Sequence, residues 1–149
     1  MSREGIAVAK EYGTGLPVFA SASEAEKTLL AQRDATLEAL DLEIQSLRPD
    51  YSPDSLKGLE KWYVEKGSPE VGLGGYSLPL AIGFYFGEVL CRRAGFEWFV
   101  AEFAFERGRY EIGVRKPLVS IMLTKGKRPR IEGNKRMQSL WREYGNYAA

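Results

Sequence analysis

The spacing of apolar residues predicts two amphipathic helices in the first half of the chain. Over residues 21–48, leucine and isoleucine recur at intervals of three and four, which places them on one helical face. Ser21 or Ser23 is a suitable N-cap, because a glutamate follows three residues after each, and Pro49 ends the helix. Similar signals predict a second helix over residues 52–67. We expect the two helices to form an antiparallel pair.

A third helix is predicted over residues 79–93. Its apolar residues lie on every side of the helix rather than on one stripe, which is typical of a buried central helix. Gly83 and Gly87 are four residues apart and would allow another element to approach this helix closely. The glycine-rich stretch before it, VGLGGYS, lacks the Gly-Lys-Ser/Thr of a phosphate-binding loop and is expected to be a flexible turn.

After Gly95 the apolar positions alternate, which is the period of a β-strand. Three strands are predicted, at residues 96–105, 110–115 and 118–123, and the short turns between them favour an antiparallel meander. Both faces of the first strand are apolar. A final helix is predicted over residues 134–147.

This order of elements predicts a single α+β domain with three N-terminal helices, a three-stranded antiparallel meander and a C-terminal helix. The domain spans residues 21–149. Residues 1–20 contain three glycines and are expected to form an irregular N-terminal arm with a short strand at LPVFA. A chain of 149 residues is long enough to bury a core without a disulfide or a metal.

The composition excludes several kinds of chemistry. The chain has no histidine and one cysteine, so it lacks Ser-His-Asp and Cys-His couples, the common zinc sites and an internal disulfide. We expect neither a cofactor nor a metal. Cys91 lies close to Arg92 and Arg93, which could activate its thiol, but a buried filler is the favoured interpretation because free cysteine is usually buried.

Charge is divided along the chain, although the net charge is only +1. Residues 1–106 hold 17 acidic and 10 basic side chains, whereas residues 107–149 hold 3 acidic and 11 basic ones. The cations of the basic segment 125–136 are Lys125, Lys127, Arg128, Arg130, Lys135 and Arg136. Such a cluster is a candidate site for phosphate or nucleic acid, while a solvated loop that balances the acidic helices is the favoured alternative.

Glu88 lies in the middle of the most apolar stretch of the chain. An ion pair with Arg92, four residues later on the same helix, is its simplest explanation. The alternatives are a buried acceptor for backbone or tyrosine donors and a general acid with a raised pKa. Hydrolase chemistry would need a second carboxylate at a defined distance, for which only loose candidates exist in Glu97, Glu102 and Glu106.

The helix LAIGFYFGEVLCRRAG, followed directly by FEWFV, resembles a loose group of small uncharacterised bacterial proteins with a Gly-x-Tyr/Phe-x-Gly-Glu-Val helix and a Gly-x-x-Trp strand. The matching positions are Gly83, Tyr85, Gly87, Glu88, Val89, Gly95 and Trp98. The similarity covers about residues 54–124. It implies a small α+β domain with no established activity, and some proteins of the group look like accessory or immunity-type binding proteins. It carries over no catalytic residue.

We therefore predict a non-enzymatic binding protein whose partner is another protein. If helices cover only one face of the apolar strand 96–105, the other face would be an interaction surface. A phosphate or nucleic-acid binder acting through the basic segment and a carboxylate-based hydrolase using Glu88 are the alternatives. Nucleic acid is the less favoured partner class.

A cytoplasmic location without a membrane partner is expected. The longest apolar run falls far short of the roughly 20 residues that a spanning helix needs. The first 15 residues also contain no apolar stretch of signal-peptide length. The sequence predicts no particular oligomeric state.

Overall fold

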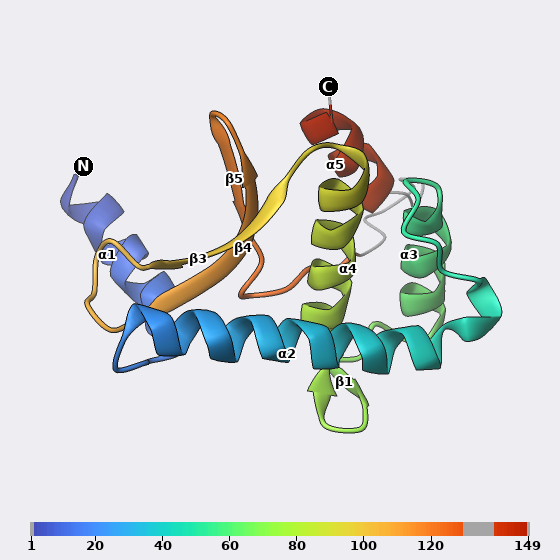
Figure 1. The fold of residues 1–149 in the computed structure, drawn as a ribbon, viewed down its shortest axis with the longest axis horizontal. Coiled ribbons are helices and arrows are strands. Elements are labelled where there is room, and N and C mark those ends of the chain that lie inside the picture. Colours follow the sequence, from blue (N-terminus) through green and yellow to red (C-terminus); the bar gives the residue numbers. More distant parts are fainter. Residues whose placement is uncertain (1, 130–138, 149) are drawn as a thin grey trace.

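The computed structural model describes residues 2–129 and 139–148. Over these residues the protein is a mixed α+β structure with five α-helices and two small antiparallel sheets (Figure 1). The helices are α1 (Arg3–Gly13), α2 (Ala22–Glu43), the 3-10 helix η1 (Gln45–Leu47), α3 (Ser55–Glu65), α4 (Leu78–Arg93) and α5 (Ser139–Ala148). The strands are β1 (Val71–Leu73), β2 (Tyr76–Ser77), β3 (Glu97–Glu102), β4 (Tyr110–Lys116) and β5 (Val119–Met122). The predicted α+β class is confirmed.

Helix α4 lies at the centre of the fold. The Ser77 hydroxyl caps its first turn by accepting a hydrogen bond from the N–H of Leu80, and Pro79 lies in that turn, where it fits without loss of a helical bond. The helix buries residues on all of its sides, as the sequence predicted. Helix α2, helix α5 and the three-stranded sheet all pack against it. Most of the core therefore forms around one short segment.

The three-stranded sheet has the order β3-β4-β5, as expected for a meander. Trp98 pairs with Val114 and Val100 with Ile112, and these side chains form the inner face, which packs on α2 and α4. The opposite side, here called the outer face, carries Phe99, which pairs with Gly113. Because successive side chains of a strand alternate between faces, the register assigns every residue of the sheet to one face.

The two glycines of α4 permit close packing. A Cβ on Gly83 would lie 3.1 Å from the Cα of Gly126, and one on Gly87 would lie 2.7 Å from the Trp98 ring. The N–H of Lys127 donates to the carbonyl of Pro79 at 2.9 Å. Segment 125–128 therefore crosses directly over α4, and the predicted close approach is confirmed.

The N-terminal residues form helix α1 rather than an irregular arm. The Ser2 hydroxyl accepts from the N–H of Gly5 at 3.0 Å, with Glu4 in the first turn and Lys10 in the last, and each of these stabilises a helix. The glycines favoured a loop, but these end effects and contacts with the sheet override them. Part of the expected LPVFA strand is present as one bridge, between Val18 and Arg109.

The glycine-rich stretch before α4 forms the hairpin β1–β2 rather than a structureless turn. Gly74 and Gly75 are its two loop residues, both with positive φ, and Leu73 pairs with Tyr76 across them. A Gly-Gly pair between short apolar strands is a strong hairpin signal. The sequence therefore contained this feature, although the expectation of a flexible turn missed it.

Helices α2 and α3 do not form the expected antiparallel pair. Figure 1 shows α2 crossing the lower end of α4. Helix α3 lies on the side of α4 away from the three-stranded sheet, and it packs on α5. The buried Glu60 of α3 accepts a hydrogen bond from the N–H of Ser139, at the start of α5, at 3.0 Å. The chain turns between α2 and α3 at Arg48 and Tyr51, which both have positive φ. In the part of the chain that the structure describes, no helix is long and apolar enough to cross a membrane.

We expect Gly126→Ala to lower the free energy of unfolding more than Gly74→Ala does. Both glycines have positive φ, so alanine costs about 1–2 kcal/mol at either position. At Gly126 a Cβ would also lie 2.6 Å from the backbone of Pro79, which adds about 1–3 kcal/mol, whereas Gly74 faces open space. Urea denaturation measures the difference. Equal losses would contradict the close packing of segment 125–128 on α4.

Candidate functional site

Glu88 uses both of its carboxylate oxygens to join α4 to other groups. Its side chain is 20% exposed. Oε1 accepts from Nε of Arg92 at 3.1 Å, which is the ion pair that the sequence favoured. Oε2 accepts from the indole N–H of Trp98, on β3, at 3.0 Å. The second donor is thus an indole rather than the backbone or tyrosine donor considered from the sequence.

Arg92 connects Glu88 to an aromatic pair. Its guanidinium lies 4.0 Å from the centroid of the Tyr51 ring, and the other partner of that ring is Tyr85, stacked at 4.4 Å. The Tyr51 hydroxyl donates to both oxygens of Asp41, at 2.9 and 3.0 Å. We call the set Trp98, Glu88, Arg92, Tyr51 and Asp41 the Glu88–Tyr51 network.

Burial raises the pKa of two members of this network, Tyr51 and Asp41. It raises the pKa of Tyr51, and the charge of Asp41 raises it further, so the hydroxyl remains a donor at neutral pH. Burial also raises the pKa of Asp41, against the opposing effects of the Tyr51 hydrogen bond and Arg92. Both carboxylates of the network already accept hydrogen bonds, which favours a structural role for Glu88 over general acid catalysis.

The network borders a depression of about 460 Å³ between α2 and α4. Glu88 and Arg92 line it from α4, and Tyr51 lines it from the turn between η1 and α3. The charged side chains that α2 contributes are Arg33, Asp34, Glu38 and Asp41. Arg33 is bound by Asp34 at 2.7 Å and lies 5.1 Å from the Trp98 ring. The depression therefore has an acidic rim, and its two arginines each form an ion pair, Arg33 with Asp34 and Arg92 with Glu88.

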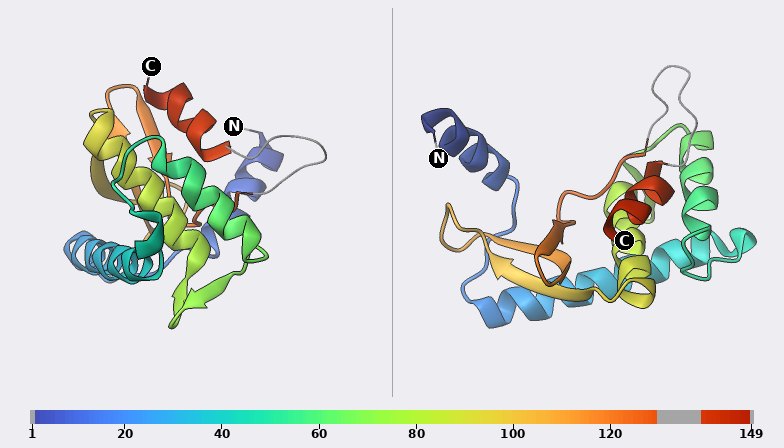
Figure 2. Two further views of the ribbon diagram at one scale, coloured as in Figure 1. Left: turned by 90° about the vertical axis from the view of Figure 1, so that its right-hand side faces the viewer. Right: turned by 90° about the horizontal axis from the view of Figure 1, so that it is seen from above.

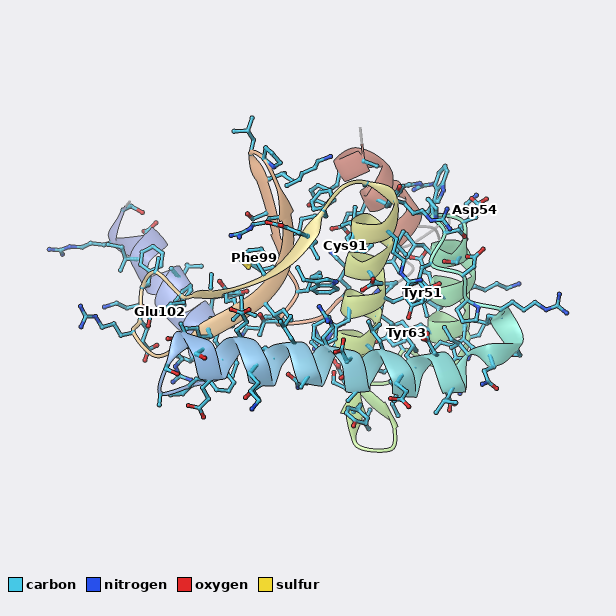
Figure 3. The ribbon with its side chains drawn as sticks, viewed as in Figure 1. Tyr51, Asp54, Tyr63, Cys91, Phe99 and Glu102 are labelled. Carbon is cyan, nitrogen blue, oxygen red and sulfur yellow. The ribbon has the colours of Figure 1, made fainter. Side chains whose placement is uncertain are left out.

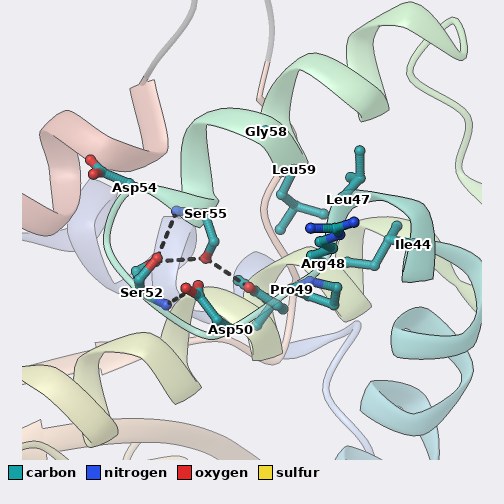
Figure 4. Close-up of a pocket in the computed structure, with 11 residues that line it drawn as sticks. Ile44, Leu47, Arg48, Pro49, Asp50, Ser52, Asp54, Ser55, Gly58 and Leu59 are labelled. Atoms are coloured by element: carbon teal, nitrogen blue, oxygen red, sulfur yellow. Dashed lines mark hydrogen bonds between the residues drawn. The ribbon is translucent and has the colours of Figure 1, made fainter.

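A second depression, of about 300 Å³, lies between η1 and α3 (Figure 4), and Tyr85 is one of its lining residues. Ser55 Oγ donates to the carbonyl of Ser52 at 2.6 Å and lies 2.7 Å from the Tyr85 hydroxyl. That hydroxyl also accepts from the N–H of Tyr51 at 3.2 Å. The Ser55 hydroxyl donates to a backbone carbonyl rather than to a general base, so this geometry does not activate it as a nucleophile. The sequence analysis did not identify this pocket, because its residues come together only through the turn at 48–51.

The described cations of the basic segment contact other groups of the same chain. Lys127 is 19% exposed, and its ammonium lies 2.6 Å from Glu143 of α5. Arg128 pairs with Glu70 at 3.0 Å, and Lys125 lies 5.0 Å from the Tyr12 ring. These contacts fit the alternative of a loop that balances acidic groups. The remaining predicted cations, Arg130, Lys135 and Arg136, lie outside the described residues.

The outer face of the sheet has an apolar centre. Phe99 of β3 and Met122 of β5 lie on either side of Gly113 in the register of the sheet, and we call these three residues the open row (Figure 3). Met122 is 38% exposed. The next row has Glu97 paired with Arg115 at 3.1 Å, and that guanidinium lies 4.7 Å from the Phe99 ring.

Helix α1 covers the far end of the outer face, past the open row. The Tyr12 hydroxyl donates to Oε1 of Glu111 at 2.6 Å, and the Tyr12 ring packs on Phe103. Figure 2 shows α1 at one end of the molecule, while α3, α4 and α5 gather at the other. The outer face is therefore covered at one end, and at its centre Phe99 is half-buried and Met122 is exposed.

Residues 18–148 match the model of a protein family described as uncharacterised protein YwmA. The chain belongs to the YwmA family. Comparisons with curated proteins and with solved structures gave no match. An uncharacterised family is what the resemblance implied, while the helix–strand motif itself stays a prediction. In this YwmA-family chain the match includes the Glu88–Tyr51 network, both depressions and the whole three-stranded sheet, and it begins after α1.

We expect Glu88→Ala to lower the free energy of unfolding by about 1–3 kcal/mol, because the half-buried indole N–H of Trp98 would lose its acceptor. Glu97→Ala is the matched control. Glu97 also binds an arginine Nε at 3.1 Å but is exposed, so its loss should cost about 0–1 kcal/mol. Glu88→Gln keeps an acceptor for Trp98 and should fall between the two. Equal effects of the two alanine variants in urea would rule out a buried acceptor role.

Native Cys91 should react with iodoacetamide at pH 8 about 100-fold more slowly than it does in the unfolded chain. Burial raises the pKa of its thiol to about 12, and the charge of Glu88 adds to this effect. The thiolate is the nucleophile, and at pH 8 very little of it forms at such a pKa. Mass spectrometry of alkylation with and without urea gives both rates. Similar rates would identify Cys91 as a reactive thiol.

Proposed function

We propose that this protein is a non-enzymatic protein-binding domain in an accessory or immunity-type role, and that its partner docks on the open row. The observation that supports this most is the position of Phe99 and Met122 on the outer face of the sheet, where Met122 is 38% exposed. Trp98 and Val100 pack inward against helices, whereas Phe99 lies on a face that α1 covers only at one end. An apolar surface that the fold leaves open is a common mark of a protein interface.

The composition of the open row fits an interface. Phe99 and Met122 offer apolar area at its centre, and the exposed Glu97–Arg115 pair forms a polar border on one side. Aromatic residues, methionine and arginine are enriched at protein interfaces, with a polar rim around an apolar centre.

Gly113 adds a steric requirement to this surface. A Cβ at this position would collide with the carbonyl of Ile121, so β4 and β5 approach each other closely only because residue 113 is a glycine. Because residue 113 is a glycine, no side chain lies between Phe99 and Met122 in this row of the sheet. Gly113 itself is buried, so a partner would contact the side chains of Phe99 and Met122 rather than the glycine.

The two alternative functions have less support. A hydrolase would need Glu88 to exchange a proton with substrate, but its oxygens are bound by Arg92 and the Trp98 indole. Phosphate binding would compete with the internal ion pairs of Lys127 and Arg128. Both functions stay hypotheses. Assays with nucleic acid at low and moderate salt test the second of them.

Photo-crosslinking tests the docking surface. We expect p-benzoylphenylalanine in place of Met122 to give a discrete protein adduct in cells that produce this protein naturally. Replacement of Leu42, which is 64% exposed on α2, provides the matched control and should give no such adduct. Adding Phe99→Asp to the Met122 variant should reduce the adduct by about tenfold or more, because interface hot spots of this kind contribute at least about 2 kcal/mol.

A further control uses Glu97→Ala, which changes the rim but leaves the apolar centre intact. It should reduce the adduct much less than Phe99→Asp, with both variants shown to be folded by circular dichroism. No adduct from position 122, or equal adducts from positions 122 and 42, would contradict the proposal.

A further inference from the structure

Glu111 is a buried carboxylate on the outer face, beneath helix α1. It lies on β4, opposite Ala101, and is 8% exposed. The Tyr12 hydroxyl of α1 donates to its Oε1 at 2.6 Å. A buried carboxylate needs such a donor, because leaving it unsatisfied away from water is strongly unfavourable. Anything that replaces α1 on this face must therefore supply a hydrogen-bond donor to Glu111.

The attachment of α1 is light. Among the side chains of α1, Ile6 is 37% exposed, Val8 is 66% exposed and Tyr12 is 37% exposed. The helix has one buried residue, Gly13, which packs against the Phe103 ring. A helix of 11 residues is marginal without tertiary contacts, so these few contacts at its C-terminal end hold it in place.

The chain is firmly fixed immediately after α1. Leu16 is 1% exposed and its carbonyl accepts from the Arg109 guanidinium at 2.7 Å. The carbonyl of Pro17 accepts from the N–H of Tyr110 at 3.0 Å. Between the helix and this anchor lie only Thr14 and Gly15. Because residue 15 is a glycine, α1 can swing at this position while the rest of the chain stays in place.

We propose that α1 is a displaceable cover and that the site beneath it binds an amphipathic helix of the partner protein. This inference rests on the proposed function, since the site adjoins the open row. Displacement of α1 would extend the apolar surface from Phe99 to Ala101 and Phe103. The partner helix would place a donor, a tyrosine hydroxyl or an ammonium group, against Glu111 in the position that Tyr12 holds.

Two features favour a partner helix over another occupant. Helix α1 itself shows what fits the site, an amphipathic helix whose tyrosine donates to a buried negative charge. The charge complementarity is specific, because an aliphatic or acidic helix would leave Glu111 without a donor. The residues that form the site belong to the region that matches the family, whereas α1 lies outside it.

Hydrogen exchange of full-length Tyr12→Phe tests the cover. Loss of the bond to Glu111 should lower the protection of α1 amides by about tenfold and leave α2 unchanged. Tyr76→Phe is the matched control, since Tyr76 is 38% exposed and forms no side-chain hydrogen bond within the described part of the chain. Unprotected α1 amides in the wild type, or equal protection in wild type and Tyr12→Phe, would overturn the proposal.

A synthetic peptide of residues 2–15 tests the helix site as a stand-in for the partner helix. It should bind Tyr12→Phe about fivefold or more tightly than it binds the wild type, because the weakened α1 competes less. The same peptide with phenylalanine at position 12 should lose most of this binding, since it brings no donor to Glu111. Equal binding of both peptides, or no binding to Tyr12→Phe, would overturn the helix site. If the peptide test fails but the Met122 variant still gives its protein adduct, the site beneath α1 is ruled out while the proposed docking on the open row stands.

Discussion

The close packing around α4 is the constraint on which the rest of the structure depends. Gly83 lets the backbone of segment 125–128 pack directly on the backbone of α4, and Gly87 leaves room for the Trp98 ring. A side chain at either position would push away an element that comes from far along the chain. The sheet and residues 125–128 are therefore positioned by the absence of side chains at Gly83 and Gly87 as much as by the residues that α4 buries.

Glu88 gains its role from this packing. Because Gly87 brings β3 close to α4, the indole N–H of Trp98 reaches the Glu88 carboxylate, whose other oxygen binds Arg92. The acid in the apolar helix thus connects the central helix to the first strand of the sheet. Its carboxylate satisfies a partly buried donor, the indole N–H of Trp98.

On the surface of the molecule, the same sheet explains the open row and the site beneath α1. Helices α2 and α4 occupy the inner face, so apolar residues of the alternate positions remain on the outer face. Glu111 interrupts this apolar surface and requires a donor, which Tyr12 provides. Basic side chains near the C-terminal end of the chain also have partners within the fold. Lys127 pairs with Glu143, and Arg128 pairs with Glu70.

The sequence by itself determined the features that depend on neighbours a few residues apart. Helix and strand periods predicted the α+β class and the meander, and four-residue spacing predicted the Glu88–Arg92 pair, because helix geometry alone places those side chains together. The sequence also contains the Ser2 N-cap and the Gly-Gly hairpin signal. The glycines in both stretches favoured a loop prediction over the helix and the hairpin that form. Only the tertiary structure decided the Trp98–Glu88 bond, the Tyr51–Asp41 bond and the covering of Glu111 by Tyr12. Those partners lie 10 to 99 residues apart, and no local pattern encodes which distant surfaces meet when the core packs.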